Sequence, residues 1–200
     1  MNAPRTYLYP ILKISGDYAV AFLSLVILSP LILILSIILL ISGGGPVIYS
    51  QQRTGKNGKQ FRIYKFRSLK HGVNISTDLI VHKNDNRITT IGRFMRKYKI
   101  DEIPNFINVL LGDMSLVGPR PEQEYYIKKI VTDAPEYRKL LEIKPGITSW
   151  GQVKYGYAST VDGMIERLQY DLYYLENRSL LFDLKILIYT AGIVFRGKGI

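Results

Sequence analysis

The sequence of 200 residues contains no cysteine and only two histidines, His71 and His82. Without cysteine, the chain has no disulfide bonds, no thiolate metal ligands and no cysteine nucleophile. Two histidines alone cannot supply the three or four ligands of a zinc site. The composition therefore excludes a secreted protein stabilised by disulfides, and it excludes most zinc chemistry.

The glycine signatures of common nucleotide-binding sites are also missing. The chain has no Gly-x-x-x-x-Gly-Lys-Ser/Thr sequence and no Gly-x-Gly-x-x-Gly sequence after a strand, which excludes a P-loop and a Rossmann site. It has no Gly-x-Ser-x-Gly sequence either, so the nucleophile elbow of the α/β-hydrolases is absent. The three consecutive glycines at 43–45 predict a bend at the edge of a membrane.

No charged residue occurs between Tyr18 and Ile41. This uncharged apolar run exceeds the roughly 20 residues that a helix needs to cross a bilayer. It is too long for the apolar core of a signal peptide, and no small-x-small cleavage site follows it. We therefore assign residues 1–45 to a membrane-embedded segment that holds the protein at a membrane.

Ser29 and Pro30 lie near the middle of this run. A proline inside a helix removes a backbone hydrogen bond and clashes with the preceding turn, so a helix broken here could enter the membrane and leave on the same side. A spanning helix shows a clear imbalance of Lys and Arg between its two ends, whereas here both flanks are basic and the downstream flank is richer. Composition alone leaves a spanning helix and a re-entrant helix open.

Acidic residues are absent from Gln51 to Thr77, and the formal net charge of the chain is +11. Such a charge indicates an anionic partner: nucleic acid, membrane lipid or a phosphorylated substrate. The basic residues surround the membrane segment and no nucleic-acid module is recognisable, so no nucleic-acid partner is expected. The basic stretch can bind lipid headgroups, at about 1 kcal/mol per residue, or a subset such as Lys65 and Arg67 can hold a pyrophosphate.

Alternating residues predict a β-hairpin with strands at 46–53 and 60–68 and an Asn-Gly turn between them. Helices are predicted at 89–100, at 122–142 with a break at Ala134-Pro135, and at 161–176. Residues 71–90 read as a polar, irregular and mobile loop, and 144–153 as a turn followed by a short strand. The apolar segment 180–196 has too short an uncharged run to span a membrane, so it is interfacial or buried. We predict a mostly helical α+β fold with a small sheet and interfacial amphipathic helices.

Two neighbouring carboxylates, Asp101 and Glu102, follow a run of basic residues and precede Pro104. Proline is tolerated in the first turn of a helix, and the apolar residues from Phe106 to Leu111 fit one buried face, so we predict a helix whose first turn holds both acids. The helix dipole would keep both ionised. Neighbours on a helix do not face each other, so the two acids are expected to have separate roles. Asp101 can be a helix N-cap, or it can be a nucleophile or metal ligand.

Arg120 lies between Pro119 and Pro121. Arginine binds phosphate oxygens with two donors at once, and the flanking prolines restrict its backbone. Arg120 is therefore a candidate phosphate clamp, with an ordinary turn cation as the alternative. Arg93 and Arg96 form another candidate cluster of cations.

Four short segments occur in order behind the membrane helix. They are Tyr64-Lys-Phe-Arg-Ser-Leu69, Asp101-Glu-Ile-Pro104, Gly112-Asp-Met-Ser-Leu-Val-Gly-Pro-Arg-Pro121 and Lys144-Pro-Gly-Ile-Thr-Ser-Trp-Gly-Gln-Val153. Together they resemble the bacterial sugar transferases, the monotopic phosphoglycosyl transferases, over nearly the whole chain. The chain is similar to the small form of the family, which lacks the additional N-terminal membrane helices of larger members.

The resemblance implies an enzyme that transfers a phosphosugar from a UDP-sugar to polyprenol phosphate, such as undecaprenol phosphate, and releases UMP. This is the first membrane step in the assembly of a surface polysaccharide such as an exopolysaccharide, O-antigen or capsule. Asp101 is implied to be the nucleophile that forms a covalent phosphosugar intermediate, and Glu102 its essential partner. Mg²⁺ is implied as the cofactor, bound at Asp101. The implied substrate-binding residues are Lys65, Arg67, Arg96, Pro119, Arg120, Pro121 and Gln152.

The resemblance also implies a location. The first helix is expected to be re-entrant and bent at Ser29 and Pro30, in contact with membrane lipid. Residues 46–200 are expected to form a membrane-associated catalytic domain on the cytoplasmic face of the bacterial inner membrane. No oligomeric state is predicted.

Departures from the family pattern at Leu69, Lys99, Asn105, Lys144 and Ser149 bear on sugar preference more than on activity. Lys144 stands where the family usually has arginine, and Ser149 where it usually has glycine; neither removes a charged group from the implied chemistry. The alternative interpretation is a non-catalytic membrane-surface protein that binds anionic lipid or a partner. That alternative explains the basic stretch but gives Asp101 and Glu102 no role.

Overall fold

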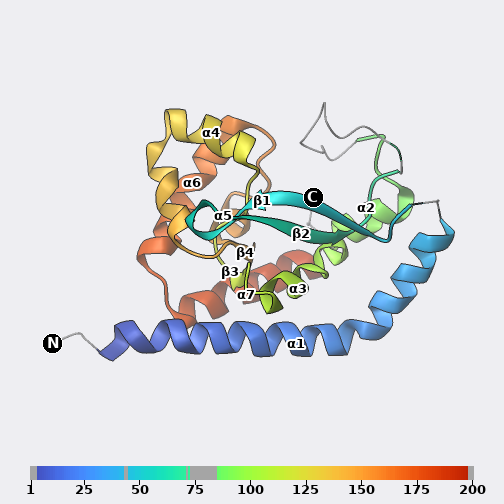
Figure 1. The fold of residues 1–200 in the computed structure, drawn as a ribbon, viewed down its shortest axis with the longest axis horizontal. Helices are drawn as coiled ribbons and strands as arrows, with labels where there is room; N and C mark the ends of the chain where they lie inside the picture. Colours follow the sequence, from blue (N-terminus) through green and yellow to red (C-terminus); the bar gives the residue numbers. More distant parts are fainter. Residues whose placement is uncertain (1–3, 43–44, 71, 73–84, 198–200) are drawn as a thin grey trace.

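The computed structural model describes residues 4–42, 45–70, 72 and 85–197. A long N-terminal helix, α1 (Pro4–Ile41), runs along one edge of the protein, and the other elements pack on one side of it (Figure 1). Most of the predicted loop at 71–90, including both histidines, lies outside the described residues.

Two pairs of strands and a set of helices form the part that packs on α1. The strands are β1 (Ile48–Thr54), β2 (Gln60–Phe66), β3 (Ser115–Val117) and β4 (Gly146–Thr148). The remaining α-helices are α2 (Thr90–Lys97), α3 (Asn105–Leu110), α4 (Glu124–Asp133), α5 (Trp150–Lys154), α6 (Val161–Glu176) and α7 (Leu180–Phe195). Three 3₁₀ helices, η1 (Lys56–Gly58), η2 (Ile100–Glu102) and η3 (Pro135–Glu142), complete the described elements. The prediction of a mostly helical fold with a small sheet is confirmed.

The predicted hairpin is confirmed as an antiparallel pair, with Ile48 opposite Phe66 and Thr54 opposite Gln60. Its turn uses Asn57, whose φ is 56°, followed by Gly58 at 76°, because residues with positive φ are tolerated best when they are Asn or Gly. β3 and β4 form a separate parallel pair. The prediction for 144–153 is partly wrong: the short strand β4 is followed by the helix α5, whose N-cap Ser149 accepts a hydrogen bond from the Gln152 amide.

Helix α1 contains a segment, Tyr9–Ile41, that is long and apolar enough to cross a membrane by length and composition; an 18-residue window within it has a mean hydropathy of 3.0. It is one continuous helix across Ser29 and Pro30, so this pair does not interrupt the helix, and re-entry into the membrane stays a prediction. The helix bends in its second half (Figure 1). Pro30 has no N–H to offer the carbonyl of Val26, and the Ser29 hydroxyl donates to that carbonyl at 2.8 Å. The Ser-Pro pair thus keeps a helix with an interior proline hydrogen-bonded.

Both halves of α1 pack on the rest of the protein. Near its end, Leu35 and Leu39 are buried in a cluster with Phe66 of β2 and Met95 of α2. Near its start, Lys13 forms an ion pair with Asp183 of α7 at 3.0 Å. The other side of α1 exposes large apolar side chains, among them Phe22, Val26, Ile27 and Leu33. The helix therefore has one protein-facing side and one unpartnered apolar side.

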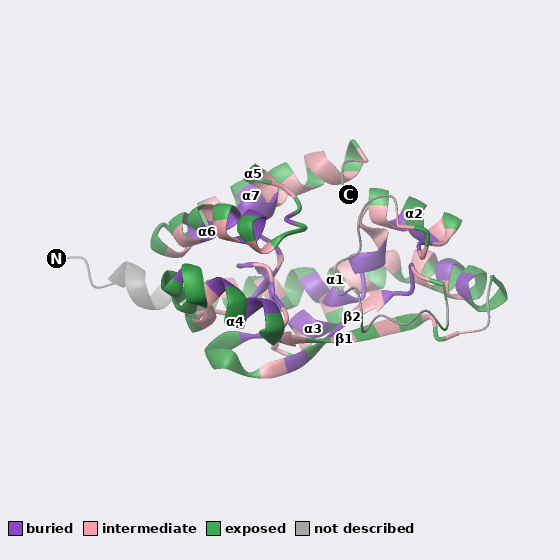
Figure 2. Ribbon diagram, turned by 90° about the horizontal axis from the view of Figure 1, so that it is seen from above, coloured by how far each residue is buried: buried purple, intermediate pink, exposed green. Residues whose placement is uncertain are grey.

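The apolar side chains of α6 and α7 explain how these helices are fixed. Met164 and Leu168 of α6 are buried against Tyr126 and Ile130 of α4, as the predicted helical spacing at 161–176 requires. In α7, Ile186 is fully buried while Leu181 and Phe195 are exposed. Figure 2 shows the same division, with buried residues on the inner sides of these helices and exposed residues outside.

Helix α2 approaches the end of β2 so closely that only glycine fits at the contact. The amide of Thr89 donates to the carbonyl of Ser68 at 3.0 Å. A Cβ on Gly92 would lie 2.1 Å from the same carbonyl oxygen. This contact fixes the distance between α2, which carries Arg96, and β2, which carries Lys65.

We expect Gly92→Ala to lower the free energy of unfolding by about 1–3 kcal/mol, as overpacking usually does. Thermal unfolding of the purified protein in detergent measures the effect. Gly192→Ala is the matched control, because a Cβ at this α7 position meets nothing within 4 Å and alanine favours a helix by about 1 kcal/mol over glycine. Equal unfolding temperatures for the two variants would contradict the tight contact.

Candidate active site

Asp101 and Glu102 lie in the 3₁₀ turn η2, which is separated from α3 by Ile103 and Pro104. The prediction that they occupy the first turn of the apolar helix is therefore wrong. The chain enters η2 through Lys99, a non-glycine residue with a φ of 53°. No side-chain cap is made at the start of η2 or α3, so the N-cap interpretation of Asp101 is also wrong. Both carboxylates are buried, with 6% and 7% of their surfaces exposed.

Three cations from three different segments surround Glu102. Lys65 of β2 donates to its Oε1 at 2.5 Å. Arg120 lies 3.7 Å and Lys99 3.9 Å from its oxygens. Burial alone would raise the pKa of Glu102, but Lys65, Lys99 and Arg120 outweigh it and hold that pKa well below its usual range. Glu102 is thus ionised and acts as the anionic centre of a cationic array.

Asp101 has a different environment. Among the residues that the structure describes, no hydrogen-bond donor and no cation within 4.0 Å is paired with its carboxylate. Burial raises the pKa of Asp101 and the Glu102 charge adds to this, while Lys65, Arg96 and Lys99 oppose it. The expectation that both acids are ionised agrees with the lowered pKa of Glu102 and stays a prediction for Asp101, whose pKa is raised by burial. The expectation of separate roles agrees with these two environments.

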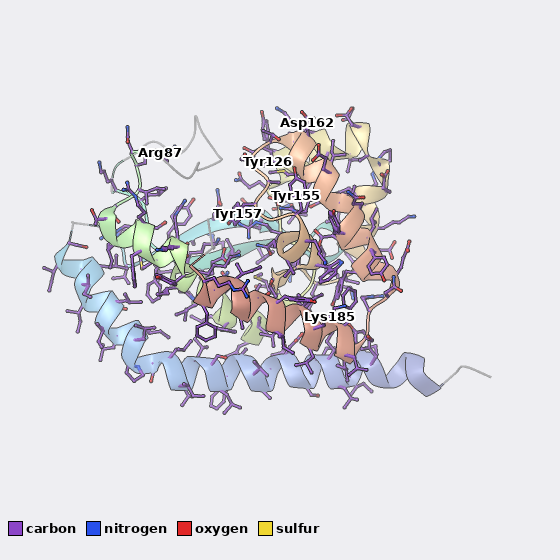
Figure 3. The ribbon with its side chains drawn as sticks, turned by 180° about the vertical axis from the view of Figure 1, so that it is seen from behind. Arg87, Tyr126, Tyr155, Tyr157, Asp162 and Lys185 are labelled. Carbon is purple, nitrogen blue, oxygen red and sulfur yellow. The ribbon has the colours of Figure 1, made fainter. Side chains whose placement is uncertain are left out.

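A cleft of about 120 Å³ brings the predicted cations to Asp101. Lys65, Arg96 and Arg120 all line it together with Asp101. Arg96 is oriented by a hydrogen bond from its Nε to the Ser68 hydroxyl at 2.9 Å. Tyr126 and Tyr157 line the side of the cleft formed by α4 and the segment before α6 (Figure 3). The cleft therefore combines one unpaired carboxylate with several fixed cations.

Arg120 is held by its backbone and by an aromatic ring. The carbonyl of Pro119 accepts from the Gly146 amide at 2.9 Å, and that of Pro121 accepts from Arg53 at 3.3 Å. The guanidinium lies over the Tyr157 ring, 4.5 Å from its centroid, and donates to the Tyr157 hydroxyl. Stacking and fixed hydrogen bonds reduce the side-chain freedom that an arginine loses when it binds phosphate.

The sequence analysis did not identify several residues of this site. Arg53 lines the cleft, and its Nη1 also donates to Glu122 at 3.2 Å. Glu122 is buried and accepts a second bond from Arg167 of α6 at 2.8 Å. Arg53 belongs to the acid-free stretch and Glu122 directly follows Pro121, so both positions could have been singled out. Nothing in the sequence indicates that Tyr157 stacks on Arg120.

Four predicted substrate-binding residues do not line the cleft: Arg67, Pro119, Pro121 and Gln152. The guanidinium of Arg67 donates to the carbonyl of Leu39 near the end of α1 at 2.6 Å, where backbone carbonyls lack helical partners. Gln152 is buried in α5, and its side-chain amide has no hydrogen-bond partner among the described residues. The structure places Arg67 at the α1 contact and Gln152 in the interior.

The residues of the cleft could bind Mg²⁺ only together with the phosphates of a substrate. Among the described residues, no three side chains of Asp, Glu or His gather where a metal ion could be held. Mg²⁺ is often bound by one or two carboxylates together with substrate phosphates. The unpaired carboxylate of Asp101 fits that mode, whereas Glu102 is occupied by cations.

Comparison with known proteins gives a consistent result. Residues 8–197 match the family described as bacterial sugar transferase. The chain is 38% identical over 197 residues to the UDP-N-acetylgalactosamine-undecaprenyl-phosphate N-acetylgalactosaminephosphotransferase of Aeromonas hydrophila, covering 96% of this chain and 45% of that protein. It is 37% identical over 205 residues to the UDP-glucose:undecaprenyl-phosphate glucose-1-phosphate transferase of Escherichia coli (strain K12), covering 98% of this chain and 42% of that protein.

A third relative is similar in length to this chain. The exopolysaccharide production protein PSS of Rhizobium leguminosarum bv. phaseoli is 34% identical over 200 residues, covering 94% of this chain and 98% of that protein. The chain thus spans less than half the length of the first two relatives and nearly all of the third. Because the family match covers most of the chain, the protein belongs to the bacterial sugar transferase family.

Proposed function

We propose that this protein transfers a phosphosugar from a UDP-sugar to polyprenol phosphate, with release of UMP. The observation that carries the proposal is the unpaired, buried carboxylate of Asp101 in a cleft lined by Lys65, Arg96 and Arg120. The names of the Aeromonas and Escherichia relatives, which describe transfer of a phosphosugar to undecaprenyl phosphate, support the same substrate classes. The acceptor is thus a polyprenol phosphate, such as undecaprenol phosphate.

The proposed reaction has two displacements at one phosphorus atom. An oxygen of Asp101 attacks the β-phosphorus of the UDP-sugar, and the bond from that phosphorus to the oxygen that bridges to the α-phosphate breaks. UMP leaves with the electron pair, and the phosphosugar remains on Asp101. An oxygen of polyprenol phosphate then attacks the same phosphorus, the bond to Asp101 breaks and the carboxylate is regenerated.

The cations perform the electrostatic part of this chemistry. A carboxylate is a weak nucleophile, and a pyrophosphate repels it, so fixed positive charge is needed in both displacements. Arg96 and Arg120 are oriented toward the cleft by Ser68 and Tyr157. Glu102 holds Lys65, Lys99 and Arg120 in place before substrate arrives. Glu102 is therefore a positioning residue, and Asp101 alone forms the covalent bond.

Mg²⁺ is the proposed cofactor, with Asp101 as its ligand from this chain. The ion would neutralise charge on the phosphate oxygens of the substrate when it is bound. Its retention at the site would depend on the substrate phosphates, since one carboxylate alone is a weak binding site for Mg²⁺.

We also propose that α1 is a re-entrant membrane helix and that the catalytic cleft faces the cytoplasm at the bacterial inner membrane. Lys13 near the start of α1 and Leu39 near its end both contact the domain formed by residues 46–200. A straight spanning helix would carry one of these ends to the opposite side of the bilayer, away from that domain. The unpartnered apolar sides of α1 and α7 would then contact lipid, with α7 as an interfacial helix.

The first prediction concerns the nucleophile. Asp101→Asn is expected to reduce UMP release from UDP-sugars by about a thousandfold or more, because the attacking group is lost. The measurement is UMP release in the presence of polyprenol phosphate, with intact mass spectrometry to detect the phosphosugar adduct on the wild-type protein. Asp133→Asn, at an exposed position of α4, is the control. Turnover close to wild type by Asp101→Asn would remove Asp101 from this role.

The second prediction concerns stability, where the two neighbouring acids should behave in opposite ways. The raised pKa of Asp101 means that its ionised form opposes folding at neutral pH, so Asp101→Asn should raise the unfolding temperature. The higher stability of Asp101→Asn over the wild-type protein should vanish as the pH falls toward the usual aspartate pKa, because Asp101 of the wild-type protein becomes protonated and neutral there. The lowered pKa of Glu102 means that its charge favours folding above the usual glutamate pKa. Glu102→Gln should therefore lower stability at neutral pH, by up to about 3 kcal/mol, because buried cations lose their partner.

Thermal unfolding of both variants from acidic to neutral pH tests this pair. Asp133→Asn serves again as the control and should change little. If Asp101→Asn is the less stable protein at neutral pH, the assignment of an uncompensated carboxylate is incorrect.

The third prediction concerns the metal. UMP release should fall to background in excess chelator and return when Mg²⁺ is added in excess over it. Full activity in the chelator would count against Mg²⁺, and the cations of the cleft would then have to suffice.

A further inference from the structure

A second cavity, of about 580 Å³, lies between the first half of α1 and the rest of the protein. Its wall includes Ile14 and Tyr18 of α1, Val117 of β3, Ile143, and Leu175 of α6. It shares no lining residue with the cleft of Asp101. Cavities of this size accommodate a small ligand or part of a larger one.

Three cations line this cavity without an ion-pair partner among the described residues: Lys56, Lys144 and Arg178. They come from three separate segments of the chain. Of the acidic residues in the wall, Asp17 is already engaged by Lys13 at 3.6 Å and by the Ser115 hydroxyl at 2.5 Å. Glu176 is the other acidic residue of the wall. Glu176 forms no ion pair among the described residues, so three unpaired cations stand against one unpaired acid; the net unpaired charge around the cavity is positive and suits an anionic group.

The cavity borders the apolar side of α1. Ile14 lines the cavity, yet 47% of its surface is exposed. The neighbouring Ile11 is 63% exposed and belongs to the unpartnered side of the helix. A molecule in the cavity can therefore place an anionic group among the cations while an apolar chain passes Ile14 onto the face of α1. This is the chemistry of an anionic lipid.

We propose that this cavity binds an anionic phospholipid of the membrane as a resident ligand. Polyprenol phosphate is also an anionic lipid, but its phosphate must reach Asp101 to react. Lys56, Lys144 and Arg178 line a cavity that shares no residue with the cleft of Asp101. This distinction from the acceptor rests on the proposed function; the binding of an anionic lipid does not. The bound lipid would lie between α1 and the domain that carries Tyr174 and Asp183, and it would strengthen that contact.

The test uses the full-length protein in phosphatidylcholine vesicles that contain phosphatidylglycerol with a photoactivatable group in its acyl chain. After irradiation, mass spectrometry identifies the labelled peptides. Labels are expected on residues 9–18 and 174–178. Ile14→Trp fills the cavity and should reduce this labelling at least about fivefold. Ile27→Trp, at an exposed position of α1 outside the cavity wall, is the matched control and should leave it unchanged.

A second pair of variants tests the charge and does not depend on how Ile14→Trp folds. The double variant Lys144→Gln and Arg178→Gln should reduce labelling by phosphatidylglycerol several-fold, and labelling by an equivalent phosphatidylcholine probe should change little. Lys128→Gln with Lys129→Gln removes the same charge from α4, away from the cavity, and should have no such effect. Circular dichroism and thermal unfolding show whether each variant is folded.

Three results would overturn the proposal. One is equal labelling of the cavity peptides by the two probes. Another is labelling by phosphatidylglycerol that neither the Ile14 variant nor the Lys144 and Arg178 variant reduces. The third is a loss of labelling when equimolar polyprenol phosphate is added before irradiation, with no loss when excess unlabelled phosphatidylglycerol is added. That result would mean that the cavity binds the acceptor polyprenol phosphate. Asp101→Asn should be labelled like wild type, so a failure of the proposed enzymatic function remains distinguishable from a failure of lipid binding.

Discussion

The ion pair between Lys65 and Glu102 is the contact on which the cleft depends. It joins β2 to the turn η2 at 2.5 Å, and the same carboxylate attracts Arg120 from the Pro-Arg-Pro segment. Three segments that are distant in sequence are thereby held around one buried charge. Removing one partner of a buried pair is costly because the other is left uncompensated. Glu102 thus stabilises the array, and Asp101 one position earlier stays free of it.

A second buried carboxylate, that of Glu122, also holds cations near the cleft. Glu122 accepts from Arg53 and from Arg167, and Arg167 also approaches Asp171 at 3.7 Å. Arg120 therefore lies near two buried acids, Glu102 and Glu122, and each of these acids is paired with other cations as well. A cation fixed in this way needs little rearrangement when negative charge develops near it, which is the most effective form of electrostatic catalysis. The burial of several charges is costly, and the pairing of Glu102 with Lys65 and of Glu122 with Arg53 and Arg167 offsets part of that cost.

The sequence predicted the elements better than it predicted their contacts. Periodicity located the hairpin, α4 with η3, and α6, because local spacing decides these elements. It misplaced Asp101 and Glu102 into a helix because the positive φ of Lys99 and the 3₁₀ turn have no clear local signal. The motif residues Lys65, Arg96 and Arg120 do lie together with Asp101, whereas Arg67 lies against α1 and Gln152 in the interior. Neither the stacking of Tyr157 on Arg120 nor the pairing of Glu122 could be predicted, since both are contacts between distant segments.

The charged residues inside α1 bear on how this helix meets the membrane. Lys13 and Asp17 lie one turn apart in α1, just before its long uncharged run, and charged side chains are costly within a bilayer unless they are paired. Lys13 pairs with Asp183, and Asp17 accepts a hydrogen bond from Ser115, so both charged residues contact the domain. Ile11 and Phe22 are exposed. The charged residues of the first half of α1 are therefore on the side that packs on the domain, and the opposite side is apolar. The bend in the second half then returns the chain to Phe66 and Met95, on the same side as it began. A helix that contacts the same domain near both of its ends supports the proposal that α1 is re-entrant.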